Sequence, residues 1–97
     1  MNYNELTDFE INKLVAFKIK SIKKGRTDRY YKDFCPDYCN NPSDAWPIIL
    51  ENKINIGTID GSVWWASLDY NEYGDQNYCE DKNPLRAAMI VYMMGDK

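Results

Sequence analysis

The chain has 97 residues, of which 44% are hydrophobic and 28% are charged. This length allows one domain in which folding buries roughly two-thirds of the unfolded chain's surface. The composition argues against disorder, collagen and membrane spanning, and no apolar run approaches the roughly 18 to 20 residues that a membrane helix needs. The absence of histidine excludes the usual catalytic triads and the zinc sites that require an imidazole. We therefore expect a single domain over residues 1–97, without membrane association.

The net charge of −3 hides a segregation along the chain. Residues 18–32 carry seven Lys or Arg residues against Asp28 alone, whereas the segments 1–17 and 33–97 are both acidic. Basic residues interleaved with tyrosines can follow a phosphate backbone and stack on bases, although a basic run is also typical of a solvated face. The residues for this nucleic-acid alternative are Lys20, Lys23, Lys24, Arg26, Arg29 and Tyr30.

The first helix is predicted over residues 8–16. Thr7 and Glu10 have the spacing of a capping box, in which each side chain satisfies a free backbone N–H group. The following stretch, 17–23, fits two more helical turns as well as an alternating strand, and the two readings stay open. A strand from the region 17–34 can therefore extend the sheet.

Two further helices begin at Asn-Pro pairs, because Asn caps a helix and Pro is accepted at its first position. One starts at Asn41-Pro42, with Pro47 as an expected distortion, and the other spans 84–94. We expect Trp46, Ala88 and Met89 in the core. The helix 84–94 is apolar on nearly every side, which is typical of a central helix or of self-association through that helix.

A β-hairpin is predicted over residues 54–68, with its turn at Asp60-Gly61. Trp64 and Trp65 are adjacent, so a regular strand points one ring toward the helices and the other toward solvent or a partner. Residues 69–82 read as a polar, acidic loop. The candidate binding residues of this region are Trp64, Trp65, Tyr70 and Tyr73.

Metal sites have weak support. The three cysteines, Cys35, Cys39 and Cys79, include a C-x₃-C pair but no second cluster, so free thiols in a reducing cytoplasm are expected in place of a zinc site. Residues 69–80 match four positions of a calcium-binding EF-hand loop, but the incoming segment reads as a strand where a helix is required. No nucleophile motif or phosphate loop is present. We expect no metal, no cofactor and no catalytic residue.

Three blocks of the sequence resemble the NinX-like family of small proteins encoded by lambdoid bacteriophages. They are Tyr3 to Lys13, Cys39 to Ile49 and Asn83 to Val91. The resemblance implies a phage protein that acts inside an infected bacterium, and it brings no catalytic residues. The order of the second helix, the Trp-bearing strand and the third helix is also similar to small phage αβα-sandwich domains.

These observations predict an α+β fold in which three helices pack on a small antiparallel sheet centred on the 54–68 hairpin. As function we expect a non-enzymatic phage accessory protein that binds a host or phage protein in the cytoplasm of the infected host. An outward tryptophan, an apolar helix and a tyrosine-rich loop are residue types that anchor protein interfaces. The alternative is a nucleic-acid contact through residues 18–32.

Overall fold

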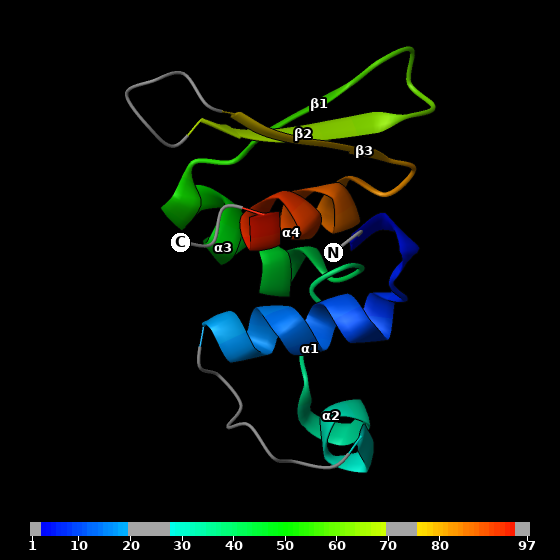
Figure 1. The fold of residues 1–97 in the computed structure, drawn as a ribbon, viewed down its shortest axis with the longest axis vertical. Helices are drawn as coiled ribbons and strands as arrows, with labels where there is room; N and C mark the ends of the chain where they lie inside the picture. The colour runs from blue at the N-terminus through cyan, green and yellow to red at the C-terminus, as the bar shows by residue number, and fades with distance from the viewer. Residues whose placement is uncertain (1–2, 20–27, 70–75, 95–97) are drawn as a thin grey trace.

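The computed structural model describes residues 3–19, 28–69 and 76–94 (Figure 1). The described residues form an α+β fold, which confirms the predicted class, with four α-helices where three were expected. In chain order the elements are η1 (Tyr3–Glu5), α1 (Asp8–Lys18), α2 (Asp28–Phe34), α3 (Pro42–Asn52), β1 (Asn55–Thr58), β2 (Trp64–Asp69), β3 (Gln76–Asp81) and α4 (Pro84–Met94).

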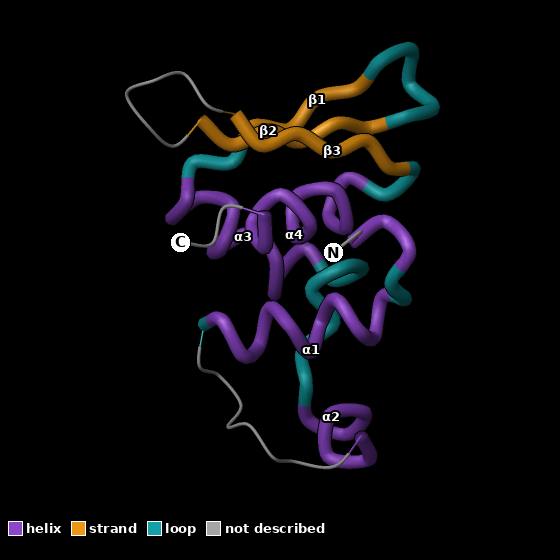
Figure 2. Tube along the Cα trace, in the orientation of Figure 1, coloured by secondary structure: helices purple, strands orange, loops and turns teal. Residues whose placement is uncertain are grey.

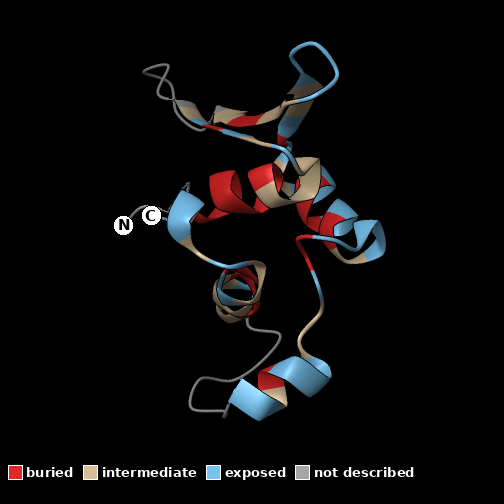
Figure 3. Ribbon diagram, turned by 90° about the vertical axis from the view of Figure 1, so that its right-hand side faces the viewer, coloured by how far each residue is buried: buried red, intermediate tan, exposed pale blue. Residues whose placement is uncertain are grey.

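The helices are stacked on one side of the sheet (Figure 2). Helix α4 lies directly against the three strands and also contacts α1 and α3, while α2 is the helix furthest from the sheet. An αβα sandwich has helices on both faces of its sheet, and the described helices cover only one. The other face, which we call the outer face, is not covered by any described helix (Figures 1 and 3).

Helix α1 begins where the capping box predicts. The Thr7 hydroxyl accepts a hydrogen bond from the Glu10 N–H at 3.1 Å, and the Glu10 carboxylate accepts one from the Thr7 N–H at 2.9 Å. The helix continues to Lys18, so the start of the undecided 17–23 stretch is helical. Residues 20–23 lie outside the described residues.

Helix α2 was not predicted. Asp28 places a negative charge in its first turn, where the helix dipole favours it. The helix is held to α1 by an ion pair of 3.1 Å between the Lys13 ammonium and Asp28, and by the edge-on contact of the Tyr31 and Phe17 rings. The segment 28–34 therefore adds a helix to the fold and not the strand that was considered for the 17–34 region.

Helix α4 is central, as its apolar sequence predicted. Asn83 caps it by accepting hydrogen bonds from the N–H groups of Leu85 and Arg86 at 2.9 and 3.3 Å. Every residue from Ala87 to Met93 is buried, which confirms the core assignment of Ala88 and Met89 (Figure 3). This burial accounts for the apolar sequence without a second chain, so self-association through 84–94 stays a prediction without support from exposed surface.

Helix α3 also begins as predicted, with the Asn41 side chain accepting a hydrogen bond from the Ser43 N–H. The helix includes Pro47 and ends at Asn52, and the following C-cap residue, Lys53, has a left-handed φ of 56°. The expectation that Trp46 is part of the core is wrong, because 51% of its surface is exposed. Among the helices and strands, α3 contacts chiefly α4, so its far side lacks a described neighbour that could cover the ring.

The sheet has the order β1-β2-β3 with antiparallel pairing throughout. The predicted hairpin is present, but its loop is wider than a two-residue turn, since the Ile59 N–H bonds to the Val63 carbonyl at 2.9 Å. The residues between them are Asp60, Gly61 and Ser62. The Asp60 carboxylate accepts hydrogen bonds from both the N–H and the hydroxyl of Ser62, which draws that residue into the turn.

The third strand corrects the loop predicted for residues 69–82. Residues 76–81 form β3, which pairs with β2 in an unbroken register from Asp69↔Gln76 to Trp64↔Asp81. The polar composition predicted a loop, but the segment forms a strand because the free edge of β2 can satisfy its backbone groups.

Candidate functional site

The outer face of the sheet carries one of the two predicted tryptophans. On neighbouring strands, Ile56, Ala66, Leu68 and Cys79 belong to or pack against the core. Alternation then places Trp65 on the opposite, outer face and Trp64 on the side of the helices. Both rings are half-buried. The regular register of β2 with both neighbours meets the condition on which the two rings were expected to face opposite ways.

The Trp65 ring is held in place by its neighbours on two strands. It lies over Gly57 of β1, where an added Cβ atom would overlap the ring carbon Cζ2. On the other side it stacks on Tyr78 of β3, with ring centroids 6.4 Å apart and an interplanar angle of 19°. Glycine at position 57 thus permits a close approach that any larger residue would block.

Tyr78 gives this aromatic pair a polar, acidic rim. The residue is 45% exposed, and its hydroxyl donates a hydrogen bond to the Glu80 carboxylate at 2.7 Å. That bond raises the pKa of Tyr78 above its usual value, because the neutral phenol is the form that donates. We refer to Gly57, Trp65, Tyr78 and Glu80 as the aromatic surface.

The sequence identified this surface only in part. Tyr70 and Tyr73, two of the four candidates, lie outside the described residues. Tyr78 and Glu80 were missed because they fall in the segment read as a loop. The available signal was the alternation of Tyr78, Cys79 and Glu80, in which an apolar thiol stands between two outward side chains.

A second exposed apolar pair lies on α3. Trp46 and Leu50, four residues apart and so on one side of the helix, are 51% and 58% exposed. Neither residue lines a described pocket.

The basic segment is only partly visible. Lys20, Lys23, Lys24 and Arg26 lie outside the described residues. Arg29 on α2 is 91% exposed and stands 3.9 Å from Asp33. Tyr30 packs on the Phe34 ring at 4.8 Å between centroids. Helix α2 as a whole carries two acids and two bases, so it contributes no net charge to a nucleic-acid contact.

One member of the basic segment serves the fold. The Lys18 ammonium donates a hydrogen bond of 2.5 Å to the Tyr92 carbonyl in the last turn of α4 and lies 4.1 Å from the centre of the Tyr92 ring. A cation is favourable at that end of a helix. Lys18 therefore holds the end of α1 against the end of α4.

Arg86, in the first turn of α4, is the centre of a polar network that joins α4 to the start of α1 and the end of β3. Its side chain is 12% exposed and forms ion pairs with Asp8 at 2.6 Å and Asp81 at 3.0 Å. It also donates hydrogen bonds to the carbonyls of Asn4 and Leu6. The single charged side chain of α4 thus fixes the start of α1 and the end of β3.

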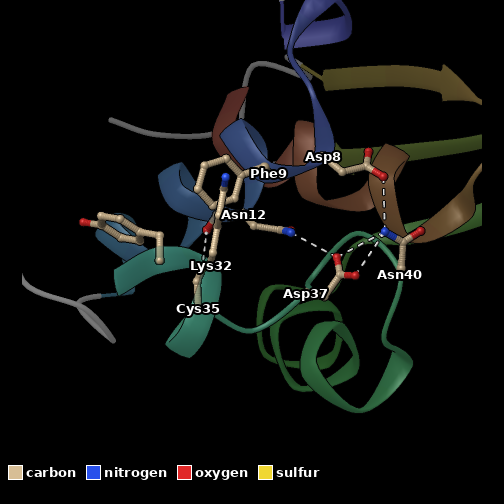
Figure 4. Close-up of a pocket in the computed structure, with 8 residues that line it drawn as sticks. Asp8, Phe9, Asn12, Lys32, Cys35, Asp37 and Asn40 are labelled. Carbon is tan, nitrogen blue, oxygen red and sulfur yellow. Dashed lines mark hydrogen bonds between the residues drawn. The ribbon is translucent and has the colours of Figure 1, made fainter. Parts of the chain in front are cut away.

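Asn40 extends this network to the loop before α3 (Figure 4). Its amide donates hydrogen bonds to Asp8 and Asp37, both at 3.1 Å, and its oxygen accepts one from Asn83. Asn12 of α1 donates to Asp37 at 3.0 Å. The three blocks that carry the family resemblance therefore meet in one network, since each contributes a residue to it.

A pocket of about 290 Å³ opens beside this network, between α1 and the end of α2 (Figure 4). Its two carboxylates, Asp8 and Asp37, are hydrogen-bonded to neighbouring side chains. Its polar groups thus serve the packing of α1 against the following loop. The lining residues are Asp8, Phe9, Asn12, Tyr31, Lys32, Cys35, Asp37 and Asn40.

The cysteines are protonated thiols at neutral pH. Burial raises the pKa of Cys35 to about 11, that of Cys39 to about 12 and that of Cys79 to about 11. A thiol so rarely ionised is a poor nucleophile. No group of three His, Cys, Asp or Glu side chains in the described part of the chain could hold a metal ion.

The EF-hand reading of residues 69–80 is not supported where the structure can test it. Residues 76–80 belong to β3 and pair with β2, whereas a calcium loop wraps its ligands around the ion. Residues 70–75 lie outside the described residues.

A family model described as "Bacteriophage P22, NinX" matches residues 2–96, which is nearly the whole chain. No curated protein and no solved structure matches the chain. Among the described residues, no helix is long and apolar enough to cross a membrane.

Proposed function

The chain belongs to the family of the phage P22 protein NinX, and from this premise we propose that it is a phage accessory protein that binds another protein through the aromatic surface. The partner is a host or phage protein, and the binding takes place in the cytoplasm of the infected bacterium. The protein acts without catalysing a reaction.

The observation that carries the proposal is the fixed Trp65 ring on the outer face. Side chains ordered before binding lose little conformational freedom when a partner arrives, and Trp and Tyr are the residues that most often anchor interfaces. Trp65 is held between Gly57 and Tyr78, so its orientation is already set in the free protein.

The chemistry of the polar groups agrees with a binding role. The three thiols have raised pKa values, and the carboxylates of the pocket are engaged in the network around Asn40 and Arg86. A general base or nucleophile needs a free group poised near neutral pH.

The test is to replace Trp65 by Ala and isolate complexes from infected cells with the tagged protein. We expect the partner to be lost with Trp65→Ala. Trp46→Ala is the matched control, since it removes an exposed ring from α3, and it should retain the partner. Circular dichroism and thermal unfolding establish that both variants are folded. Retention of the same partner by folded Trp65→Ala would contradict the proposal.

The exposure of Arg29 favours a second candidate, a nucleic-acid contact through residues 18–32. The candidate residues are Lys20, Lys23, Lys24, Arg26, Arg29 and Tyr30. Binding to phosphates weakens as salt rises, in proportion to the number of phosphates contacted. Filter binding at several salt concentrations, with Arg29→Ala beside the unchanged protein, should show a reduced slope if this contact exists. A flat salt dependence rejects this candidate.

A further inference from the structure

Strand β3 has a free edge, and the register shows which backbone groups point to it. The bond from the Ile59 N–H to the Val63 carbonyl defines the hydrogen-bonded pairs of β1 and β2. Because such pairs alternate along an antiparallel ladder, Trp65 and Ser67 bond to β1, while Trp64, Ala66 and Leu68 bond to β3. Residues 77, 79 and 81 of β3 therefore face β2.

It follows that the N–H and C=O groups of Tyr78 and Glu80 point away from the sheet. No backbone partner for them lies among the described residues. Their side chains also belong to the aromatic surface, since Tyr78 stacks on Trp65 and Glu80 accepts the Tyr78 hydroxyl. The Glu80 carbonyl accepts only a long hydrogen bond of 3.6 Å from the Cys79 thiol. Outward backbone groups and the Trp65–Tyr78 pair, of which Tyr78 is exposed, thus meet along one strand.

The two edges of the sheet differ in how well they can accept another strand. The β1 edge is four residues long and contains Gly57. The β3 edge is six residues long, has no proline and keeps an unbroken register with β2. Regular edges without such interruptions are the ones that pair with added strands.

We propose that the β3 edge receives an extended, lysine- or arginine-rich segment of the partner protein as a fourth strand. The segment pairs with the backbone of Tyr78 and Glu80 and lays side chains on the Trp65–Tyr78 pair. This mode of binding is β-strand addition, in which backbone bonds give affinity and the side chains between them give specificity. The inference rests on the proposed protein-binding function and assigns the partner's chemistry.

The charge of the strand favours a basic occupant. Strand β3 carries two acids, Glu80 and Asp81, and no base. Asp81 is engaged by Arg86, which leaves the Glu80 carboxylate at the exposed edge. Opposite charges on facing strands stabilise the pair and like charges destabilise it. A second copy of this chain would bring another acidic strand, and a nucleic acid would bring phosphates.

The experiment follows hydrogen exchange residue by residue by NMR. The probe is a synthetic peptide of about eight alternating Lys and Val residues, and its control has Glu in place of Lys. In the free protein the Tyr78 and Glu80 amides should exchange quickly and those of Asn77 and Cys79 slowly. The Lys peptide should slow the Tyr78 and Glu80 amides about tenfold or more, and the Glu peptide should not. Equal protection by both peptides, or none by either, overturns the proposal.

The variant that isolates strand addition is Glu80→Pro. Proline is accepted on an edge strand where the N–H points outward, so the fold should survive while one edge donor is removed. Glu80→Gln keeps that donor and removes only the charge. We expect Glu80→Pro to lose the protection given by the Lys peptide, and Glu80→Gln to weaken it less. If Glu80→Pro does not fold, the peptide comparison on the unchanged protein still decides.

The outcomes separate the two proposals. If Glu80→Pro keeps the partner from infected cells while Trp65→Ala loses it, strand addition is overturned and the binding function stands. If both keep the partner, the binding function through this surface fails as well. Sedimentation at two concentrations tests for a second copy, and a dimer that dissociates with Glu80→Pro overturns the basic partner.

Discussion

Helices α3 and α4 begin with the same Asn-Pro pair and meet different environments. In both, the asparagine caps the first turn through its side-chain oxygen. Aligned from their caps, Trp46 of α3 stands where α4 has Ala88, yet the tryptophan is 51% exposed and the alanine is completely buried. The local sequence sets where a helix begins, whereas its place in the fold decides which sides are covered.

The exposure of Trp46 and Ala88 differs because different numbers of helices and strands surround α3 and α4. Helix α4 touches all three strands, α1 and α3, so nearly every side of it is enclosed. Helix α3 lies at the margin, where Trp46 and Leu50 remain exposed. At the aligned positions, the small Ala88 is enclosed, whereas the large Trp46 lies on the open side of α3.

The largest loss of unfolding free energy is expected from replacing Arg86, the only charged residue of α4. Arg86→Met removes the ion pairs with Asp8 and Asp81 and the hydrogen bonds to the carbonyls of Asn4 and Leu6. Breaking such a largely buried ion pair costs about 3 kcal/mol of unfolding free energy. Urea denaturation measures this loss.

Asp44, the residue of α3 that aligns with Arg86, provides the control. Asp44→Asn should change the unfolding free energy by no more than about 0.5 kcal/mol, because no ion pair depends on it in the described structure. Equal losses from the two substitutions would remove the contrast between the helices.

A smaller loss of stability is expected from enlarging a fully buried residue of α4. Ala88→Leu adds three carbon atoms to a fully buried site and should cost about 2 kcal/mol through overpacking. Trp46→Ala, at the aligned position of α3, should cost less than about 1 kcal/mol. Thermal unfolding of the two variants side by side makes the comparison, and a greater loss from Trp46→Ala would contradict it.

The two asparagine caps should differ modestly in how much they contribute to the free energy of unfolding. Asn41→Ala removes a single cap and should cost about 1 kcal/mol. Asn83→Ala should cost more, about 1.5 kcal/mol, because the Asn83 amide also donates hydrogen bonds to the Cys39 carbonyl and to Asn40. Urea unfolding of both variants tests the order, and equal losses would show that these extra bonds contribute nothing.

Features fixed by neighbouring residues could be predicted from the sequence. The capping box at Thr7 and the two Asn-Pro starts depend on atoms within four residues of each other. The hairpin was also predictable, but its width depends on how Ser62 bonds to Asp60, and a turn signal alone does not specify that contact.

Features that depend on distant neighbours could not be predicted. Strand β3 is polar because one side of it faces solvent at the sheet's edge, so its composition resembled that of a loop. Trp46 was expected in the core because the sequence does not show that the far side of α3 lacks a neighbour. For the candidate surface, alternation correctly separated Trp64 from Trp65, but the contact of Trp65 with Tyr78 depends on the β3 register.

The smallest expected effect distinguishes the charged cap of α1 from the amide caps of α3 and α4. Hydrogen bonds from the Thr7 N–H and hydroxyl hold the pKa of Glu10 below its ordinary value of 4.5. Because the folded pKa is the lower one, this stabilisation is complete above the unfolded value and is lost as the pH falls through the folded value. Glu10→Gln keeps a capping partner that does not titrate. The difference in unfolding free energy between the unchanged protein and Glu10→Gln should therefore shift in favour of the variant as the pH is lowered from about 6 to about 3.

Asn41→Ala is the matched control, because an amide cap has no proton to gain and its cost in unfolding free energy should stay constant over the same range. A cost of Asn41→Ala that varied as strongly as the Glu10 difference would mean that the pH dependence arises elsewhere in the molecule.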